Sequence, residues 1–118
     1  MPSTMSTTSS EPGDIGLAEI PFTSGQPGKV RPVLVLWTEG EDCVVCSITA
    51  ARPRGPRDLE LKDWADEGLL RPSTCRLGRL HTMEQGLLVR RIGQLSAADA
   101  DRIARVWRER MRPAWVTG

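Results

Sequence analysis

The sequence predicts a small α+β domain, mainly β, in which a curled antiparallel sheet is followed by one C-terminal helix. The chain has 118 residues, which is enough for one domain with a single modest core. Short apolar stretches recur between residues 15 and 92 and are separated by Gly, Pro and polar turns, the pattern of strands joined by short connections. One longer segment near the end has helical periodicity instead. Short strands followed by a helix favour a curled sheet with the helix packed on it.

The first strands are predicted in the N-terminal half of the chain. Residues 15–20 form a short strand that stops at Pro21. A loop rich in Gly and Pro follows, and Arg31-Pro32 opens the apolar run 33–37, with proline at the first position of the strand. After a polar turn, residues 43–50 resume an apolar strand, so these two runs are expected to pair antiparallel.

The second half is predicted to continue the sheet after an irregular basic loop. Two prolines and a glycine interrupt residues 52–57, which therefore form neither strand nor helix. Residues 58–61 alternate like a short strand, and residues 63–70 suggest a helical turn closed by Gly68. The remaining strand candidates are 75–80 and 86–92.

The C-terminal helix is predicted from Ser96 to about Met111. Ser96 is a good N-cap, and acidic side chains follow it in the first turns, where they favour the helix dipole. Pro113 ends the helix. One apolar stripe runs along it, made of Ala100, Ile103, Ala104, Trp107 and Met111.

Composition predicts the bounds of the folded domain and the location of the protein in the cell. Residues 1–12 have too few apolar side chains to join a core and are expected to form a disordered tail, so the folded domain spans residues 13–118. The longest uncharged apolar run, 33–37, is far shorter than the roughly 20 residues of a spanning helix. The start carries neither the basic nor the apolar region of a secretory signal. We therefore expect a cytoplasmic protein with reduced thiols.

Charge is distributed unevenly along the chain. The formal net charge is only +1, but the residues after Thr49 hold fourteen cations against nine acids. Fourteen of the sixteen cations are arginine, the side chain suited to bidentate phosphate contacts. Such a balance excludes bulk nucleic-acid binding of the histone type and allows a local basic groove.

Several polar side chains are candidates for chemistry. Arg31 stands beside the conformationally fixed Pro32, where a guanidinium can be held in place, and the hydroxyl of Thr49 ends the neighbouring strand. Arg52 and Arg54 of the basic loop can meet a phosphate backbone, although an exposed loop arginine is as readily a solvated surface residue. Threonine near a strand end is also simply a β-former. His81, the single histidine, is a candidate acid or base or a surface residue.

Metal and nucleotide sites are not supported. Cys43, Cys46, Cys75 and His81 supply a nominal zinc set, but residues three apart in a strand point to opposite faces and no turn brings the first two thiols together. Cys46 is in phase with its apolar neighbours and is expected in the core. The isolated glycines make no phosphate-binding loop.

The order of these features resembles the MazF/PemK family of toxin endoribonucleases from bacterial toxin–antitoxin systems. The resemblance covers residue 13 to about residue 111. The matching pieces are GDI at 13–15, PF at 21–22, KVRPVLVL at 29–36, VVCSIT at 44–49, PSTCRL at 72–77 and RIGQLS at 91–96.

The resemblance implies an SH3-like barrel with a C-terminal helix, a homodimer, and cleavage of single-stranded RNA at a short sequence without metal or other cofactor. The products would be a 2′,3′-cyclic phosphate or 3′-phosphate and a 5′-hydroxyl. Arg31 and Thr49 fall where the family's catalytic pair lies, and an antitoxin protein with a flexible acidic segment would occupy the RNA groove. The residues assigned to RNA binding are Lys29, Ser47, Arg52, Arg54 and Arg76.

One departure leaves the general base open. Some PemK-type members carry Arg-x-Asp in the strand that matches Arg76-Leu77-Gly78, and the present chain has glycine in place of that aspartate. His81 is a candidate substitute, because imidazole suits proton transfer at neutral pH. The alternatives are a non-catalytic protein of the same fold, either a gyrase poison of the CcdB type or a degenerate toxin, and a plain protein-interaction module.

Overall fold

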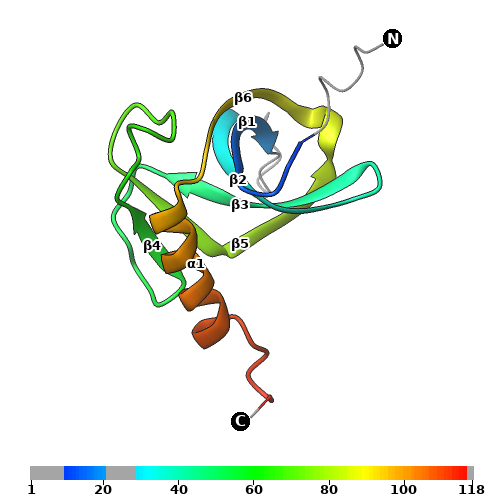
Figure 1. Cartoon of the computed structure of the whole chain (residues 1–118). Helices are drawn as coiled ribbons and strands as arrows, with labels where there is room; N and C mark the ends of the chain where they lie inside the picture. Colours follow the sequence, from blue (N-terminus) through cyan, green and yellow to red (C-terminus); the bar gives the residue numbers. More distant parts are fainter. Residues whose placement is uncertain (1–9, 21–28, 117–118) are drawn as a thin grey trace.

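The computed structural model describes residues 10–20 and 29–116, which form one six-stranded antiparallel sheet and one α-helix (Figure 1). The spatial order of the strands is β4-β5-β3-β2-β1-β6. The elements are β1 (Asp14–Ile20), β2 (Lys29–Glu39), β3 (Asp42–Thr49), β4 (Asp58–Leu61), β5 (Ser73–Glu84), the 3-10 turn η2 (Gln85–Leu87), β6 (Leu88–Gln94) and α1 (Ala97–Arg110).

The expected fold class is correct, with one difference in the closure of the sheet. The sheet curls strongly, and β4 and β6 are its two edges (Figure 1). Within the residues described, no pairing joins β6 back to β4 or β5, so the expected barrel is seen as an open, curled sheet. No helix of the described chain is long and apolar enough to cross a membrane.

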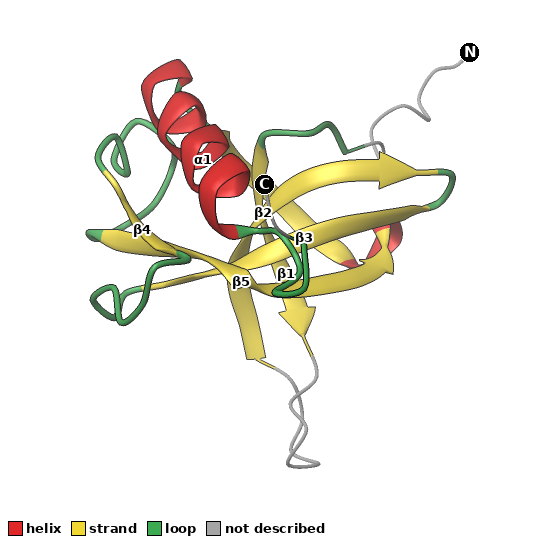
Figure 2. Cartoon of the chain, turned by 90° about the horizontal axis from the view of Figure 1, so that it is seen from below, coloured by secondary structure: helices red, strands yellow, loops and turns green. Residues whose placement is uncertain are grey.

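The strand register assigns each side chain to one of two faces. Leu34 pairs with Cys46, and both belong to the main core, which α1 covers with Ile103 (Figure 2). The prediction that Cys46 is a core residue is confirmed, since it is fully buried. The opposite face holds a smaller core around Val33 and Val45. Side chains two residues apart in a strand lie on the same face, so Arg31 shares the face of Val33, away from α1.

Two strands are longer than the sequence predicts. β2 begins at Lys29, so Pro32 lies inside the strand and not at its first position. Proline is tolerated there because the β2–β3 ladder starts one residue later, at Val33. β5 runs from Ser73 to Glu84, and residues 77–79 bulge from it, because Ser47 pairs with Arg76 while Cys46 pairs with Leu80.

The predicted helix is confirmed to within one residue at each end. Ser96 is its N-cap, and its hydroxyl accepts a hydrogen bond from the Asp99 amide. Asp99 is fully buried and accepts hydrogen bonds from the backbone amides of Lys62 and Asp63 at 3.2 and 3.0 Å. The Ser96 hydroxyl also donates to Asp63 Oδ2 at 2.7 Å. The first turn of α1 therefore holds the segment that follows β4.

That segment is the predicted helical turn, and Gly68 closes it as expected. Gly68 has φ of +92°, and the amides of Gly68 and Leu69 bond to the carbonyls of Ala65 and Trp64, which is the Schellman arrangement. A Cβ on Gly68 would clash with the Ile92 carbonyl of β6. The turn thus packs its backbone directly on β6 and fixes where the chain enters β5.

The expected disordered tail, residues 1–12, falls mostly outside the described residues, which begin at Ser10. The Ser10 amide donates to Gln85 Oε1 at 3.0 Å, and the Glu11 amide donates to Asp14 Oδ2 at 2.9 Å. These two bonds tie the start of the described chain to η2 and β1.

Candidate active site

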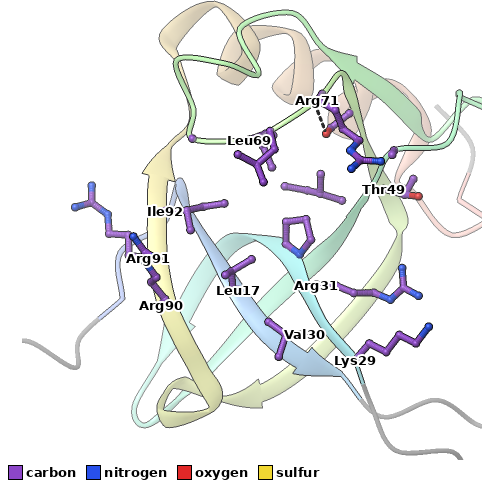
Figure 3. Close-up of a pocket in the computed structure, with 16 residues that line it drawn as sticks. Leu17, Lys29, Val30, Arg31, Thr49, Leu69, Arg71, Arg90, Arg91 and Ile92 are labelled. Atoms are coloured by element: carbon purple, nitrogen blue, oxygen red, sulfur yellow. Dashed lines mark hydrogen bonds between the residues drawn. The ribbon is translucent and has the colours of Figure 1, made fainter.

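A groove of about 710 Å³ lies where β2 begins and β3 ends (Figure 3). β1 contributes Leu17 to its lining, β2 contributes residues 29–32, and β3 and the residue after it contribute 48–50. The far walls are the segment 68–73 and residues 90–92 of β6. Five segments that are distant in the sequence therefore meet around one opening.

Arg31 and Thr49 lie at this groove as a cross-strand pair. Val33 pairs with Ser47 at the end of the β2–β3 ladder. Two residues further along each strand are Arg31 and Thr49, so the register places them opposite each other and on one face. Both line the groove, with the Arg31 side chain exposed and Thr49 half-buried.

The hydroxyl of Thr49 is oriented by the backbone that follows it. Its Oγ1 accepts a hydrogen bond from the Ala51 amide at 3.2 Å. Since a hydroxyl carries one donor and two acceptor positions, the proton of Thr49 remains free to be donated into the groove. Thr49 also pairs with the buried Thr74 of β5, which fixes the end of the strand.

The groove combines a cationic rim with an apolar floor. Lys29, Arg31 and Arg71 lie along one side with Thr49, as Figure 3 shows. Arg90 and Arg91 lie on the other side, and Arg91 is paired with Asp14 at 3.1 Å. The lining residues of the described chain include no Asp, Glu or His. The floor between the two sides is made of Leu17, Pro32, Ile48, Leu69 and Ile92.

The structure brings together three of the predicted site residues, Lys29, Arg31 and Thr49. Ser47 lies on the same sheet face, since it pairs with Val33, but it does not line the groove. Arg76 lies opposite Ser47, and its Nε is 3.6 Å from Asp58 Oδ1 of β4. The Asp58 carboxylate therefore partly neutralises the charge of Arg76.

The other predicted residues lie outside the groove. Arg52 and Arg54 are exposed on the loop after β3, where the Arg54 amide donates to Asp58 Oδ2 at 2.9 Å. His81 is half-buried and pairs with Val45. Val45 precedes Thr49 by four residues, which is roughly 13 Å along a strand. His81 is therefore not brought to the Arg31–Thr49 pair.

Gly78, the last residue of Arg76-Leu77-Gly78, is exposed in the bulge of β5. A Cβ at Gly78 would make an ordinary contact with the Arg57 side chain at 3.5 Å. Arg57 itself donates from Nε to the Arg110 carbonyl at 2.8 Å, at the end of α1. The backbone at this position therefore does not require glycine.

Arg71, Arg90 and Arg91 were not identified from the sequence. The chain has fourteen arginines, and no local pattern distinguishes these three. The groove arises only when β6 pairs with β1 and the segment before β5 folds against it.

Two buried carboxyl groups support the groove wall from behind. Burial raises the pKa of Glu67 to about 7, and the neighbouring Asp99 adds to this, while the Ser96 amide donates to Glu67 Oε2 at 2.9 Å and opposes it. Asp99 is buried too, but hydrogen bonds from the Asp63 and Lys62 amides lower its pKa, with help from Arg102. Within the described ranges, no cluster of His, Cys, Asp and Glu could hold a metal ion.

Comparisons with known proteins agree on one family. A family model described as PemK-like, MazF-like toxin of type II toxin-antitoxin system matches residues 11–109. The Mycobacterium tuberculosis toxin MazF-mt6 is 26% identical with a TM-score of 0.65, over 79% of this chain and 90% of that one. No curated protein sequence matches the chain significantly.

Two further solved structures share the fold at lower identity. An endoribonuclease in complex with its cognate antitoxin from Mycobacterial species has a TM-score of 0.71 at 14% identity, over 92% of this chain and all of that one (100%). A second endoribonuclease from Mycobacterial species has a TM-score of 0.68 at 14% identity, over 91% of this chain and 95% of that one.

Proposed function

The chain belongs to the PemK-like, MazF-like toxins of type II toxin–antitoxin systems, and we propose that it is an endoribonuclease that cleaves single-stranded RNA in the groove of Arg31 and Thr49. The observation that carries the proposal is this pair, opposite each other on β2 and β3 in a cationic groove. Messenger RNA is the proposed substrate, and the reaction takes place in the cytoplasm.

The proposed reaction needs no metal. The 2′-oxygen attacks the adjacent phosphorus, the bond from phosphorus to the 5′-oxygen breaks, and the products are a 2′,3′-cyclic phosphate and a 5′-hydroxyl. The 2′-hydroxyl gives up its proton, and the leaving 5′-oxygen takes one up. Negative charge builds on the phosphoryl oxygens in the transition state, so positioned donors at those oxygens lower the barrier.

Arg31 and Thr49 have separate roles in this proposal. Arginine stays protonated at every physiological pH, so Arg31 acts as an electrostatic stabiliser and a donor rather than a base. The Oγ1 of Thr49 accepts a hydrogen bond from the Ala51 amide, which leaves the hydroxyl proton available. Thr49 therefore donates a hydrogen bond to a phosphoryl oxygen. We assign no side chain as the base. His81 lies opposite Val45, outside the groove, so it does not reach the 2′-hydroxyl from its place on β5.

RNA binding in this proposal begins at the groove and continues beyond it. Lys29 lies in the groove, and Arg52 and Arg54 are exposed on the loop directly after Thr49, where a strand leaving the groove would meet them. Ser47 and Arg76 share the sheet face of Arg31 and Thr49. Single-stranded RNA is the form whose phosphates and bases such a groove can contact together.

We also propose that an antitoxin neutralises the protein by occupying this groove. A structural relative is an endoribonuclease in complex with its cognate antitoxin. Five cations and no carboxylate among the described lining residues suit an acidic, flexible segment. The active form is proposed to be a homodimer, which sedimentation at micromolar concentration tests directly.

The deciding experiment compares the wild type with Arg31→Ala on a long unstructured RNA in EDTA, followed by mapping of the fragment ends. Arg105→Ala is the matched control, since Arg105 is an exposed arginine of α1 paired with Glu109. We expect cuts at a recurring short motif with cyclic-phosphate ends for the wild type and the control, and none for Arg31→Ala. Intact RNA with all three proteins folded would instead favour a non-catalytic binding protein, such as a gyrase poison of the same fold.

A further inference from the structure

Arg71 is a groove residue that neither the sequence nor the family assignment singles out. It is exposed, it lines the groove, and within the described chain it forms no ion pair. Nearby arginines are already engaged, Arg76 with Asp58 and Arg91 with Asp14. Arg71 therefore offers a full positive charge to a ligand of the groove.

The backbone of Arg71 is held firmly on both sides. Before it, Leu69 is buried in the main core, and the turn that Gly68 closes packs on β6. After it, the Ser73 hydroxyl donates to the Arg71 carbonyl at 2.8 Å (Figure 3). A cation on such a fixed backbone loses less conformational freedom on binding than one on a mobile loop.

The cations form a row with the Arg31–Thr49 pair at its centre. Figure 3 shows Arg71, Thr49, Arg31 and Lys29 following one another along one side of the groove. Lys29 and Arg31 alternate with Val30 on β2, so they share a face and lie roughly 7 Å apart along the strand. Arg71 lies on the segment before β5, and its side chain is at the end of the row opposite Lys29 (Figure 3).

We infer that Arg71 binds the RNA phosphate that neighbours the scissile phosphate, on the side away from Lys29. The inference rests on the proposed function, in which Arg31 and Thr49 hold the scissile phosphate. Consecutive phosphates of one strand would then meet Arg71, the Arg31–Thr49 pair and Lys29 in that order. The positive charges of the groove thus set which phosphate of the RNA lies at the Arg31–Thr49 pair.

The inference predicts a binding role with a defined signature. A contact to a neighbouring phosphate is the same in the ground state and in the transition state, so its loss raises KM and leaves kcat nearly unchanged. Each phosphate contact to a single strand contributes about 0.7 to the slope of log Kd against log salt. Removal of Arg71 therefore lowers that slope by about 0.7 and weakens binding about fivefold at low salt.

The test measures fluorescence anisotropy of a labelled single-stranded oligodeoxyuridylate, which lacks the 2′-hydroxyl and is not cleaved. Binding is titrated at several NaCl concentrations with the wild type, Arg71→Ala, Arg71→Lys and the control Arg105→Ala. We expect Arg71→Ala alone to lose affinity and slope, and Arg71→Lys to keep the slope because it keeps the charge. On the mapped RNA substrate, Arg71→Ala should raise KM with kcat within about twofold.

The outcomes separate this inference from the proposed function. If the wild type cleaves RNA and Arg71→Ala matches Arg105→Ala in affinity and slope, the inference about Arg71 is wrong and the proposed function stands. If Arg71→Ala lowers kcat as strongly as Arg31→Ala while its slope is unchanged, the neighbouring-phosphate role is also overturned. Wild-type protein that neither binds the strand nor cleaves RNA would overturn both.

Discussion

Thr49 is the residue on which the chemistry of the groove can be tested most cleanly. Thr49→Val keeps the β-branched shape and replaces the hydroxyl with a methyl group. Loss of one donor to the developing charge is expected to lower the cleavage rate about 10²-fold to 10³-fold. Thr49→Ser keeps the donor and should stay within about tenfold of the wild type.

Single-turnover cleavage of the mapped RNA measures the Thr49 prediction, with circular dichroism to show that each variant is folded. Ala51, whose amide donates a hydrogen bond to Thr49 Oγ1, is exposed. Loss of this bond in Thr49→Val therefore lowers the unfolding free energy only slightly. A Thr49→Val rate within about twofold of the wild type would assign the hydroxyl no part in the chemistry.

Glu67 links the stability of the protein to pH. Burial raises its pKa to about 7 from an ordinary 4.5, and Asp99 adds to this. The folded chain therefore binds this proton more tightly than the unfolded chain does. The stabilisation is fully present below about pH 4.5 and is lost as pH rises through about 7. Asp99 is the charged group that acts on Glu67, and Asp99 is itself paired with Arg102 at 2.8 Å.

Replacement of Glu67 with glutamine should remove this pH dependence. Glu67→Gln keeps an acceptor for the Ser96 amide and cannot ionise. Between pH 4.5 and 7, the wild type should lose on the order of 2 kcal/mol of unfolding free energy relative to Glu67→Gln. Urea denaturation at several pH values measures it. Parallel pH profiles for the two proteins would show that folding leaves the pKa of Glu67 unchanged.

At this scale, the sequence could name candidate residues from their neighbours along the chain. Arg31 beside Pro32 and Thr49 at the end of an apolar strand are such candidates, and both line the groove. The position of Arg71 in the groove could not be predicted, because it depends on how the turn closed by Gly68 packs on β6. His81 was considered for its chemistry alone, and the register of β5 places it opposite Val45, away from the groove.

Among the elements, the turn after β4 and strand β6 depend on two glycines in direct backbone contact. A Cβ on Gly93 would clash with the Glu67 carbonyl, and one on Gly68 with the Ile92 carbonyl. Neither neighbour is a flexible side chain, so the two segments must separate to admit a methyl group. This contact holds the wall of the groove that carries Arg71.

Gly93→Ala should therefore lower the unfolding free energy by about 2 to 4 kcal/mol and weaken RNA binding through the displaced wall. Gly86→Ala is the matched control, because nothing lies within 4 Å of a Cβ there. Thermal denaturation of both variants measures the difference. Equal melting temperatures for Gly93→Ala and Gly86→Ala would mean that the turn and β6 separate at no cost.

The elements themselves followed from the sequence where local signals were strong. The N-cap of Ser96 and the apolar stripe set α1 to within one residue at each end. The bounds of β2 and β5 were less predictable. Pro32 suggested the start of a strand, but β2 continues before it, because Pro32 pairs with Leu17 of β1 and has no partner on β3. The bulge at residues 77–79 depends on a register with β3 that no local pattern encodes.

For the whole molecule, the α+β class was predictable from short alternating strands followed by one periodic helix. The strand order β4-β5-β3-β2-β1-β6 was not, since β6 pairs with β1 across most of the sequence. That one pairing encloses the groove and brings Arg90 and Arg91 opposite Lys29 and Arg71 (Figure 3). Composition therefore only allowed a local basic groove, and the topology located it.

The net charge and the groove together predict how RNA binding responds to salt. The chain has a net charge of only +1, so its attraction for RNA must come from the groove and not from the whole surface. Four groove cations are expected to contact phosphates, Lys29, Arg31, Arg71 and Arg90, whereas Arg91 is already paired with Asp14. For a single strand, four phosphate contacts give a slope of about −3 for log affinity against log salt.

Affinity for a labelled oligodeoxyuridylate should therefore fall about 50-fold between about 50 and 200 mM NaCl. Arg90→Ala should make the slope shallower by about 0.7, and Arg91→Ala by less, because Asp14 already neutralises that guanidinium. Anisotropy titrations at constant pH give both slopes. A wild-type slope shallower than about −1 would mean that the apolar floor, and not the cations, holds the strand, and the order of phosphates along Arg71, Arg31 and Lys29 would have to be abandoned.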